Sequence, residues 1–384
     1  MTKSRCYLCG EPELEEFPHF SEASLTTDGQ LVPLAARNAQ CGRCGLMQKL
    51  QVAAKIFEHL SYTDTYDLYN RPGVKKFDDA RYRDYAQWVG THLPQAAGRI
   101  IEIGCGAGWV LSHLQQTWLQ HRFEGLEPAA SAYRAALTNG LQVKQGTLGN
   151  GGSVLEGAAF DFAYSINVLE HTPDPVQFLR EMAAVVKPGG TILTICPNSD
   201  VISSELLYID HLFSIRRSNL EAMYCKAELR PSHSASGIGV MADLQVMVGT
   251  VGQAAEADQN YSVPVTLLQA RRNYYEAWHR FDDLLNSRIG DADEVICFGA
   301  GETSDLMSFF APNAWARVQG YAIDRVSDDK PAQYRELPLY FIEEVPKTAT
   351  LILGTKQHYQ NRLYERLSDK FRHVVRWDDV FLGM

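Results

Sequence analysis

The chain has 384 residues, of which 45% are hydrophobic and 21% charged, so its composition is that of a globular protein with two or three domains. The formal net charge is −10 at pH 7 and no Lys/Arg block stands out, which gives no electrostatic reason to expect a nucleic-acid partner. The sequence has neither a signal-peptide pattern nor an apolar run of about 20 residues, so we expect a cytoplasmic protein with no membrane partner.

The N-terminal part, residues 1–65, contains a cysteine pattern typical of metal sites. Cys6 and Cys9 form one C-x-x-C pair, Cys41 and Cys44 form another, and a glycine follows each pair. Two residues between thiolates let both sulfur atoms reach one tetrahedral ion. The pattern predicts a structural zinc site, because four thiolates leave no open coordination position and so short a segment cannot fold on its core alone. Disulfides in an oxidising compartment are the alternative.

A tyrosine-rich stretch follows, with Tyr62, Tyr66 and Tyr69. Such residues can close as a lid over a ligand, or they can pack as an apolar seam between two modules. The sequence leaves both interpretations open. Residues 75–93 are then predicted to form a helix that ends before Pro94.

The stretch Ile100–Leu111, IIEIGCGAGWVL, predicts a buried parallel strand, a glycine turn and the start of a helix. Glycines at alternate positions remove side chains, so main-chain N–H groups can approach a ligand closely. The residues that build this turn are Glu102, Gly104, Gly106 and Gly108. A second apolar run ends in Glu127 and Pro128, where a carboxylate can accept hydrogen bonds from both hydroxyls of a ribose. The pattern predicts a pocket for a nucleoside-type ligand.

Alternating elements continue beyond this pocket. We expect a helix over 129–139, a short strand over 141–145, strands over 160–165 and 191–196, and the last strands of this core within 228–251. Two further motifs lie among them, DFAYSINVLEH at 161–171 and KPGG at 187–190. Alternation of strands and helices predicts a doubly wound α/β fold.

In this order, the glycine turn, the acidic end of the second strand, the VLEH segment and the PGG turn resemble the class I S-adenosylmethionine-dependent methyltransferases. An NAD-binding domain shares the first turn, but the G-x-G-x-G spacing and the PGG turn argue against it. The resemblance implies a seven-stranded Rossmann-like core, over residues 66–255, with S-adenosylmethionine as cofactor. The cofactor-binding residues that it implies are Glu102, Gly104, Gly106, Gly108, Glu127, Pro128 and Asn167.

A narrower resemblance rests on the segment after the fifth strand. Tyr208, Asp210 and His211 are similar to the Tyr-x-Glu-His element of the sugar C-methyltransferases, which also carry an N-terminal zinc domain and a third, nucleotide-fold domain. The resemblance implies that His211 is the base, assisted by the tyrosine and the acid, and that His171 faces the methyl-transfer channel. The aspartate is one methylene shorter than the family's glutamate. Structural roles for both histidines remain open at this point.

The C-terminal part, residues 256–384, begins with a predicted long helix over 264–288 that joins it to the core. A strand, the turn Gly299-Ala300-Gly301 and a helix follow, and a second strand ends near Asp324. This order predicts a small Rossmann-like domain. It either holds the nucleotide of a nucleotide-sugar or serves as a scaffold beside the active site.

Together these patterns predict an α/β protein with an N-terminal zinc-knuckle module, a seven-stranded methyltransferase core and a small C-terminal Rossmann-like domain. The expected function is C-methylation of a nucleotide-linked ketosugar in antibiotic, other natural-product or glycan biosynthesis, with a histidine as general base. An O- or N-methyltransferase of a sugar, glycan or peptide natural product is the main alternative. A non-catalytic adaptor that binds S-adenosylmethionine or a nucleotide is a third. The sequence does not indicate an oligomeric state.

Overall fold

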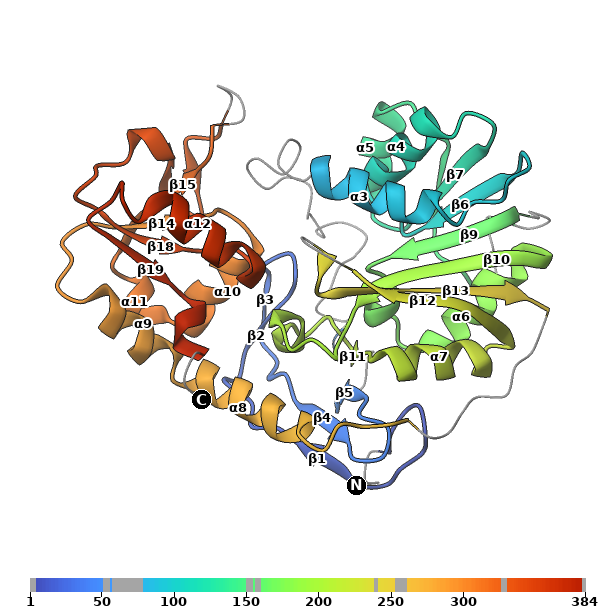
Figure 1. Ribbon diagram of the computed structural model, residues 1–384, viewed down its shortest axis with the longest axis horizontal. Helices are drawn as coiled ribbons and strands as arrows, with labels where there is room; N and C mark the ends of the chain where they lie inside the picture. Colours follow the sequence, from blue (N-terminus) through green and yellow to red (C-terminus); the bar gives the residue numbers. More distant parts are fainter. Residues whose placement is uncertain are drawn as a thin grey trace. The chain divides into compact units, whose positions relative to one another are not determined.

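The computed structural model describes residues 5–50, 56, 79–149, 155, 160–237, 241–252, 261–325 and 330–381 (Figure 1). The chain divides into two compact units. Unit 1 comprises Met1–Ser24, Val32–Tyr69 and Asp78–Leu268, and unit 2 comprises Leu25–Leu31, Asn70–Phe77 and Gln269–Met384. The tyrosine-rich stretch lies outside the described residues. The boundaries at 65/66 and 255/256 lie outside them as well, so the three-domain division stays a prediction.

Unit 1 is built on a seven-stranded sheet with the order β12-β13-β10-β9-β6-β7-β8. Its strands are β6 (Arg99–Ile103), β7 (Arg122–Glu127), β8 (Val143–Gln145), β9 (Phe160–Ile166), β10 (Val186–Pro197), β12 (Leu229–Ser236) and β13 (Leu244–Val251). Strand β13 runs antiparallel to β10 and β12, whereas β10, β9, β6, β7 and β8 pair in parallel. The predicted turn at 187–190 is a bulge inside β10, where the register against β9 shifts and Gly189 has φ 79°. The predicted seven-stranded α/β core is confirmed.

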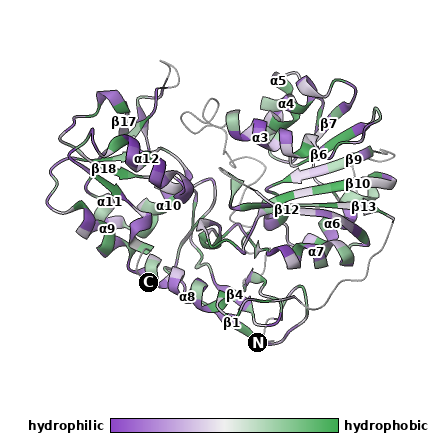
Figure 2. Ribbon diagram, in the orientation of Figure 1, coloured by the Kyte–Doolittle hydropathy of each residue, from purple (hydrophilic) through white to green (hydrophobic). Residues whose placement is uncertain are grey.

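Helices cover both faces of this sheet (Figure 1). They are α3 (Asp79–Gly90), α4 (Trp109–Thr117), α5 (Ala130–Thr138), α6 (Pro175–Ala184) and α7 (Arg217–Lys226). Successive side chains of a strand point to opposite faces, so Ile100 belongs to one buried cluster with Leu111 of α4, and Ile101 belongs to another with Leu179 of α6. The helices around the sheet mix hydrophilic and hydrophobic residues along their length, as amphipathic helices do (Figure 2). Two cores therefore hold the sheet between two helical layers.

A second, four-stranded sheet of unit 1 contains the N-terminal segment. Its order is β1-β4-β5-β11, with β1 (Leu14–Glu16), β4 (Asn38–Cys41), β5 (Met47–Lys49) and β11 (Phe213–Ser214). A two-stranded hairpin, β2 (Ser24–Leu25) and β3 (Leu31–Val32), interrupts it in sequence. Strand β11 comes from the segment after β10, so the methyltransferase-like core supplies the last strand of the N-terminal sheet. A bond from Asn219 Nδ2 to the main-chain oxygen of Cys44, 2.8 Å long, adds a further tie.

Unit 2 has a six-stranded sheet with the order β16-β17-β15-β14-β18-β19. The strands are β14 (Val295–Phe298), β15 (Val318–Ile323), β16 (Gln333–Tyr334), β17 (Leu337–Phe341), β18 (Thr350–Leu353) and β19 (His373–Arg376), and the helices are α9 (Phe281–Ile289), α10 (Glu302–Phe310), α11 (Pro312–Trp315) and α12 (Gln360–Leu367). Five strands are parallel and β16 is antiparallel to β17. The arrangement matches the predicted small doubly wound domain.

The predicted helix over 264–288 is two helices, α8 (Leu267–His279) and α9. Arg280 between them has φ −99° and ψ 1°, outside the helical region. The Asp282 carboxylate accepts hydrogen bonds from the main-chain N–H groups of Asn313 and Ala314, which fixes α9 against α11. A periodic apolar pattern cannot reveal such a break, because both helices keep the same period. None of the helices in the described ranges is long and apolar enough to cross a membrane.

Candidate functional site

The glycine turn follows β6 and has the bare main chain that its sequence predicts. Gly104, Gly106 and Gly108 have φ values of 74°, 55° and 77°, a region that side chains strongly disfavour. An added Cβ at Gly104 would lie 2.6 Å from a Val168 methyl carbon, and one at Gly108 would lie 2.1 Å from a Leu141 methyl carbon. Glycine is therefore required at both positions for the turn to approach its neighbours.

Glu127, at the end of β7, holds this turn in place. Its Oε2 accepts a hydrogen bond of 2.7 Å from the Gly106 N–H, and its Oε1 accepts one of 2.8 Å from the Ala129 N–H. Burial raises the pKa of the carboxyl, whereas the two N–H groups act in the opposite direction. The carboxylate keeps further lone pairs for a ligand, because each oxygen can accept more than one hydrogen bond.

Glu102 lies inside β6 and bonds to Tyr164 in β9. The Tyr164 hydroxyl donates a 2.9 Å hydrogen bond to Glu102 Oε2. Burial raises the pKa of Glu102 to about 8, with the tyrosine bond lowering it and Glu127 raising it. Without a bound ligand this carboxyl is therefore largely protonated at pH 7.

The pKa of Glu102 predicts how stability depends on pH. The folded-state pKa is about 8 against an ordinary 4.5, so the folded protein binds a proton that the unfolded chain releases. Glu102 thus favours folding below pH 4.5, and this contribution is lost as the pH rises toward about 8. Urea unfolding of Glu102→Gln, compared with the wild type at pH 5 and pH 8, should show a weaker decline of the free energy of unfolding in the variant. Parallel declines in both proteins would contradict this assignment.

Asn167 and Pro128 complete the predicted cofactor set. Asn167 follows β9 with φ 52°, and its side-chain Nδ2 lies 3.3 Å from the hydroxyl oxygen of Tyr85 in α3. The main-chain oxygen of Pro128 accepts a 3.3 Å hydrogen bond from Gln145 Nε2. The predicted residues gather at the carboxyl ends of β6, β7 and β9, the edge at which open α/β sheets bind ligands. Tyr85 was not predicted, because a tyrosine in an amphipathic helix carries no specific signal.

The predicted catalytic side chains form a second cluster. His171 ends a 3₁₀ turn (Leu169–His171) after β9, and His211 lies in the segment after β10. Their rings pack edge to face with centroids 4.8 Å apart, and the Tyr208 ring is 5.7 Å from that of His211. Tyr208, Asp210 and His211 are buried. His171 and His211, which are 40 residues apart in sequence, therefore lie side by side in the folded chain.

Each histidine has a different carboxyl partner from the one that the sequence motif suggests: Asp210 lies beside His171, and Glu205 lies beside His211. The main-chain oxygen of Asp210 lies 2.9 Å from His171 Nδ1, and its carboxylate Oδ2 lies 3.7 Å from the same atom. Glu205 places Oε2 at 3.5 Å from His211 Nδ1. Glu205 sits in a 3₁₀ turn (Ser204–Leu207), where no periodic pattern marks a buried side chain. Sequence reasoning therefore missed it.

Burial and neighbouring charges shift the pKa values of the two histidines in opposite directions. Burial and the nearby His211 lower the pKa of His171 to about 4. Burial acts on His211 in the same direction, but Glu205, Asp210 and Glu170 outweigh it and raise the pKa. Burial raises the pKa of Glu170 to about 7, and both of its carboxylate oxygens are without a hydrogen-bond partner among the described residues. His171 is thus neutral at pH 7, whereas the pKa of His211 is shifted in the opposite direction.

Glu170, His171 and His211 also offer potential metal-ligand atoms within 4.8 Å of one another. A tetrahedral zinc ion with bonds of 2.0–2.1 Å would hold neighbouring N and O ligands about 3.4 Å apart. Glu170 Oε1 and His171 Nε2 are 4.0 Å apart. The cluster is therefore wider than such a site.

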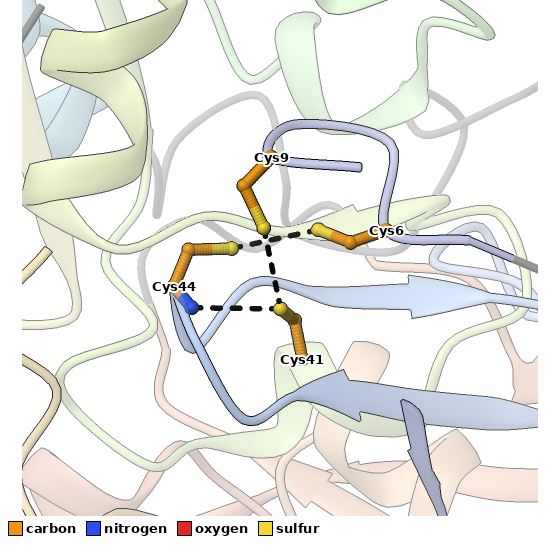
Figure 3. Close-up of side chains that lie close together, drawn as sticks. All are labelled: Cys6, Cys9, Cys41 and Cys44. Carbon is orange, nitrogen blue, oxygen red and sulfur yellow. Dashed lines mark hydrogen bonds between the residues drawn. The ribbon is translucent and has the colours of Figure 1, made fainter. Parts of the chain in front are cut away.

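The four N-terminal cysteines point their sulfur atoms toward a common centre (Figure 3). The sulfur atoms of Cys6 and Cys44 are 3.5 Å apart, as are those of Cys9 and Cys41. A tetrahedral zinc ion with Zn–S bonds of 2.3 Å would place its ligands about 3.8 Å apart. Hydrogen bonds among the thiols lower the pKa of Cys41 and raise the pKa values of Cys6 and Cys44. The donor set and spacing fit zinc, and the described cysteines are all free thiols.

Residues 77–237 match the profile of a protein family described as a methyltransferase domain. This part of the chain is similar to known methyltransferase domains. Similar curated proteins include the ubiquinone biosynthesis O-methyltransferase of Paraburkholderia phymatum, 30% identical over 125 residues, covering 30% of this chain and 52% of that protein. Another, from Albidiferax ferrireducens, is 29% identical over 112 residues, covering 28% of this chain and 44% of that one. The chain spans about half the length of the curated relatives it matches.

Solved structures with a similar fold include an O-methyltransferase family protein from Burkholderia thailandensis, with 18% identity, a TM-score of 0.38, and coverage of 47% of this chain and 59% of that one. A methyltransferase from Thermotoga maritima, described as a possible histamine N-methyltransferase, has 22% identity, a TM-score of 0.36, and coverage of 46% of this chain and 92% of that one. S-adenosylmethionine is the methyl donor of such domains.

Substitution of Glu127 tests the cofactor pocket. Glu127→Ala should weaken the binding of S-adenosylmethionine by about 1 to 3 kcal/mol, or roughly 5- to 150-fold, because a charge-assisted hydrogen bond to the ribose is lost. Isothermal titration calorimetry measures the change. Glu124→Ala in the same strand is the control, because Glu124 pairs with Arg99 at 2.8 Å instead of contacting the turn. Equal affinities of the two variants would place the ribose elsewhere.

Proposed function

We propose that this protein is an S-adenosylmethionine-dependent methyltransferase that methylates a carbon atom next to a keto group in a nucleotide-linked sugar. The observation that carries this proposal is the buried cluster of His171, His211 and Tyr208. It begins four residues after Asn167, at the edge of the sheet where the glycine turn and Glu127 form the cofactor pocket. A proton-accepting cluster at this edge fits an acceptor that must be deprotonated before it receives the methyl group.

Carbon methylation needs a base and a group that stabilises an enolate oxygen. Bound S-adenosylmethionine supplies an electrophilic methyl group that requires alignment but no activation by the protein. His211 takes the proton from the acceptor carbon on Nε2, because Nδ1 is engaged by Glu205. The Tyr208 hydroxyl, on the same segment, stabilises the negative charge on the acceptor oxygen. His171, neutral near pH 7, lines the channel beside them.

The four cysteines of the N-terminal segment are proposed to bind structural zinc. Four thiolates complete a tetrahedral shell, so the ion has no position for a substrate. Unit 2 is proposed to bind a nucleotide at its own glycine turn, where Gly299 has φ 118° and an added Cβ would lie 2.6 Å from the Gly354 oxygen. Asp324, at the end of β15, pairs with Arg366 at 2.9 Å. The setting is a cytoplasmic pathway of natural-product or glycan biosynthesis.

A panel of keto-sugar nucleotides tests this function. Incubation with S-adenosylmethionine should give one product whose mass increases by one methyl group, and NMR spectroscopy should place that methyl on carbon. In deuterated buffer without cofactor, the enzyme should exchange the proton next to the keto group. A methyl ether and no exchange would instead show an O-methyltransferase, the activity named for the curated relatives. A non-catalytic adaptor would yield neither product. If calorimetry detected no binding of S-adenosylmethionine, the proposed cofactor pocket would be refuted.

A further inference from the structure

We propose that Glu205 is the positioning residue of His211: it accepts a hydrogen bond from Nδ1 and so keeps the Nε2 lone pair directed at the acceptor. In the sugar C-methyltransferase motif the assisting acid is the residue just before the histidine, which here is Asp210. The inference rests on the proposed function for the role of His211 as base. The relation between Glu205 and His211 can nevertheless be measured without any acceptor.

The contacts of Glu205 hold its carboxylate in one place. Oε2 accepts a 3.0 Å hydrogen bond from the Ser214 hydroxyl and lies 3.5 Å from His211 Nδ1. The side chain of Glu205 and that of His211 are each 7% exposed. Ser214 belongs to β11, which pairs with β5, so a strand fixed by main-chain hydrogen bonds orients the carboxylate. An imidazole beside a carboxylate donates from the nitrogen that faces it, which determines the tautomer of the ring.

Asp210 occupies a different position, although it is adjacent to His211 in sequence. Its main-chain oxygen and its carboxylate both face His171 Nδ1, at 2.9 and 3.7 Å. Each histidine of the pair therefore has its own acceptor at Nδ1. The shorter aspartate is sufficient for this arrangement, because the main-chain oxygen makes the closer contact.

The charges around His211 come from four segments. They are Glu205 in the turn Ser204–Leu207, Glu170 and His171 in the turn Leu169–His171, Asp210 and Tyr208 in the loop of His211, and Lys49 in β5. Lys49 is buried, its Nζ donates a 2.6 Å hydrogen bond to Asn38 Oδ1, and its N–H bonds to the Leu212 oxygen at 3.0 Å. Burial lowers the pKa of Lys49 to about 8, whereas Glu205 and Asp210 raise it. Loss of one carboxylate therefore removes negative charge that stabilises the protonated ring of His211.

The experiment is NMR spectroscopy of ¹⁵N-histidine-labelled full-length protein, with the His211 signals identified by their loss in His211→Gln. Neutral His211 of the wild type should be the Nδ1–H tautomer. In Glu205→Gln, which keeps the shape but removes the charge, the pKa of His211 should fall by about one unit or more. The acid limb of the kcat/KM profile should move to lower pH by the same amount. Asp210→Asn is the matched control and should lower the pKa of His211 less.

Two results would overturn the inference. One is an Nε2–H tautomer in the wild type, a measurement that does not depend on how any variant folds. The other is a pKa of His211 that is unchanged in Glu205→Gln, or that falls further in Asp210→Asn. Turnover of His211→Gln is a separate measurement of the proposed function, because it reports whether His211 is the base at all. The affinity for S-adenosylmethionine should stay unchanged in Glu205→Gln, since the hydrogen bonds described for Glu205 involve Ser214 and His211 and the glycine turn is held by Glu127.

Discussion

His211→Gln should lower turnover by about 10² to 10⁴ while leaving the affinity for S-adenosylmethionine unchanged. The variant removes a proton acceptor from the buried cluster with His171 and Tyr208 but does not touch the turn held by Glu127. Glutamine fills much of the space of the imidazole, so the neighbouring carboxylates stay covered. Steady-state kinetics with the acceptor found in the nucleotide-sugar panel, together with calorimetry of cofactor binding, provides both measurements.

His121→Gln is the matched control, because His121 is a buried histidine whose Nδ1 accepts a 3.2 Å bond from the Gly98 N–H, away from the cluster. It should retain wild-type turnover. A His211 variant with near-normal rates would assign the ring to packing. His171→Gln would then be the next variant to test, since its ring lies beside that of His211.

Cys41→Ser should abolish stoichiometric zinc and reduce turnover by at least about tenfold, with a much smaller effect on cofactor affinity. A structural zinc ion is worth about 10 to 16 kcal/mol in small zinc-dependent domains, more than so short a segment can replace by burial. Cys41 ends β4, which pairs with β5, and β5 pairs with β11 two residues after His211. Loss of such a metal ion is therefore expected to loosen the strand next to the His211 segment before it affects the glycine turn.

Metal content is measured by mass spectrometry, and stability by thermal unfolding. Cys225→Ser serves as the control, because Cys225 lies in α7 outside the cysteine cluster, and it should retain zinc and activity. A fully active Cys41→Ser protein without zinc would refute the structural role. Retention of zinc in that variant would instead show that three cysteines suffice to bind the ion.

The sequence predicts the features that depend on short-range patterns. The glycine turn, the acidic end of β7 and the paired cysteines are recognisable because each needs particular residues at fixed spacing within about ten positions. The order of strands also follows from apolar runs, since buried parallel strands are nearly continuous in hydrophobic residues. For these parts the structure adds distances to an arrangement that was already expected.

Other features depend on contacts between distant segments and leave no local pattern. Strand β11 has two residues, too few to show a period, and its pairing with β5 depends on how unit 1 packs. Glu205 is an acid in a 3₁₀ turn, and only the folded loop shows that it faces His211. The position of α9 after the break at Arg280 is fixed by Asp282, whose partners are about 30 residues away. Tertiary contacts therefore decide the details that matter most for the chemistry.

The shared four-stranded sheet limits how this protein can be re-engineered. A shortened protein that begins at α3 would keep every strand of the main sheet but would leave β11 without its neighbour β5. Likewise, a chimera that imports a foreign loop between β10 and α7 would have to import a matching N-terminal segment. Exchange of acceptor preference between related enzymes is thus expected to succeed when residues 5–50 and 198–216 are transplanted together, and to give inactive protein when either piece is moved alone.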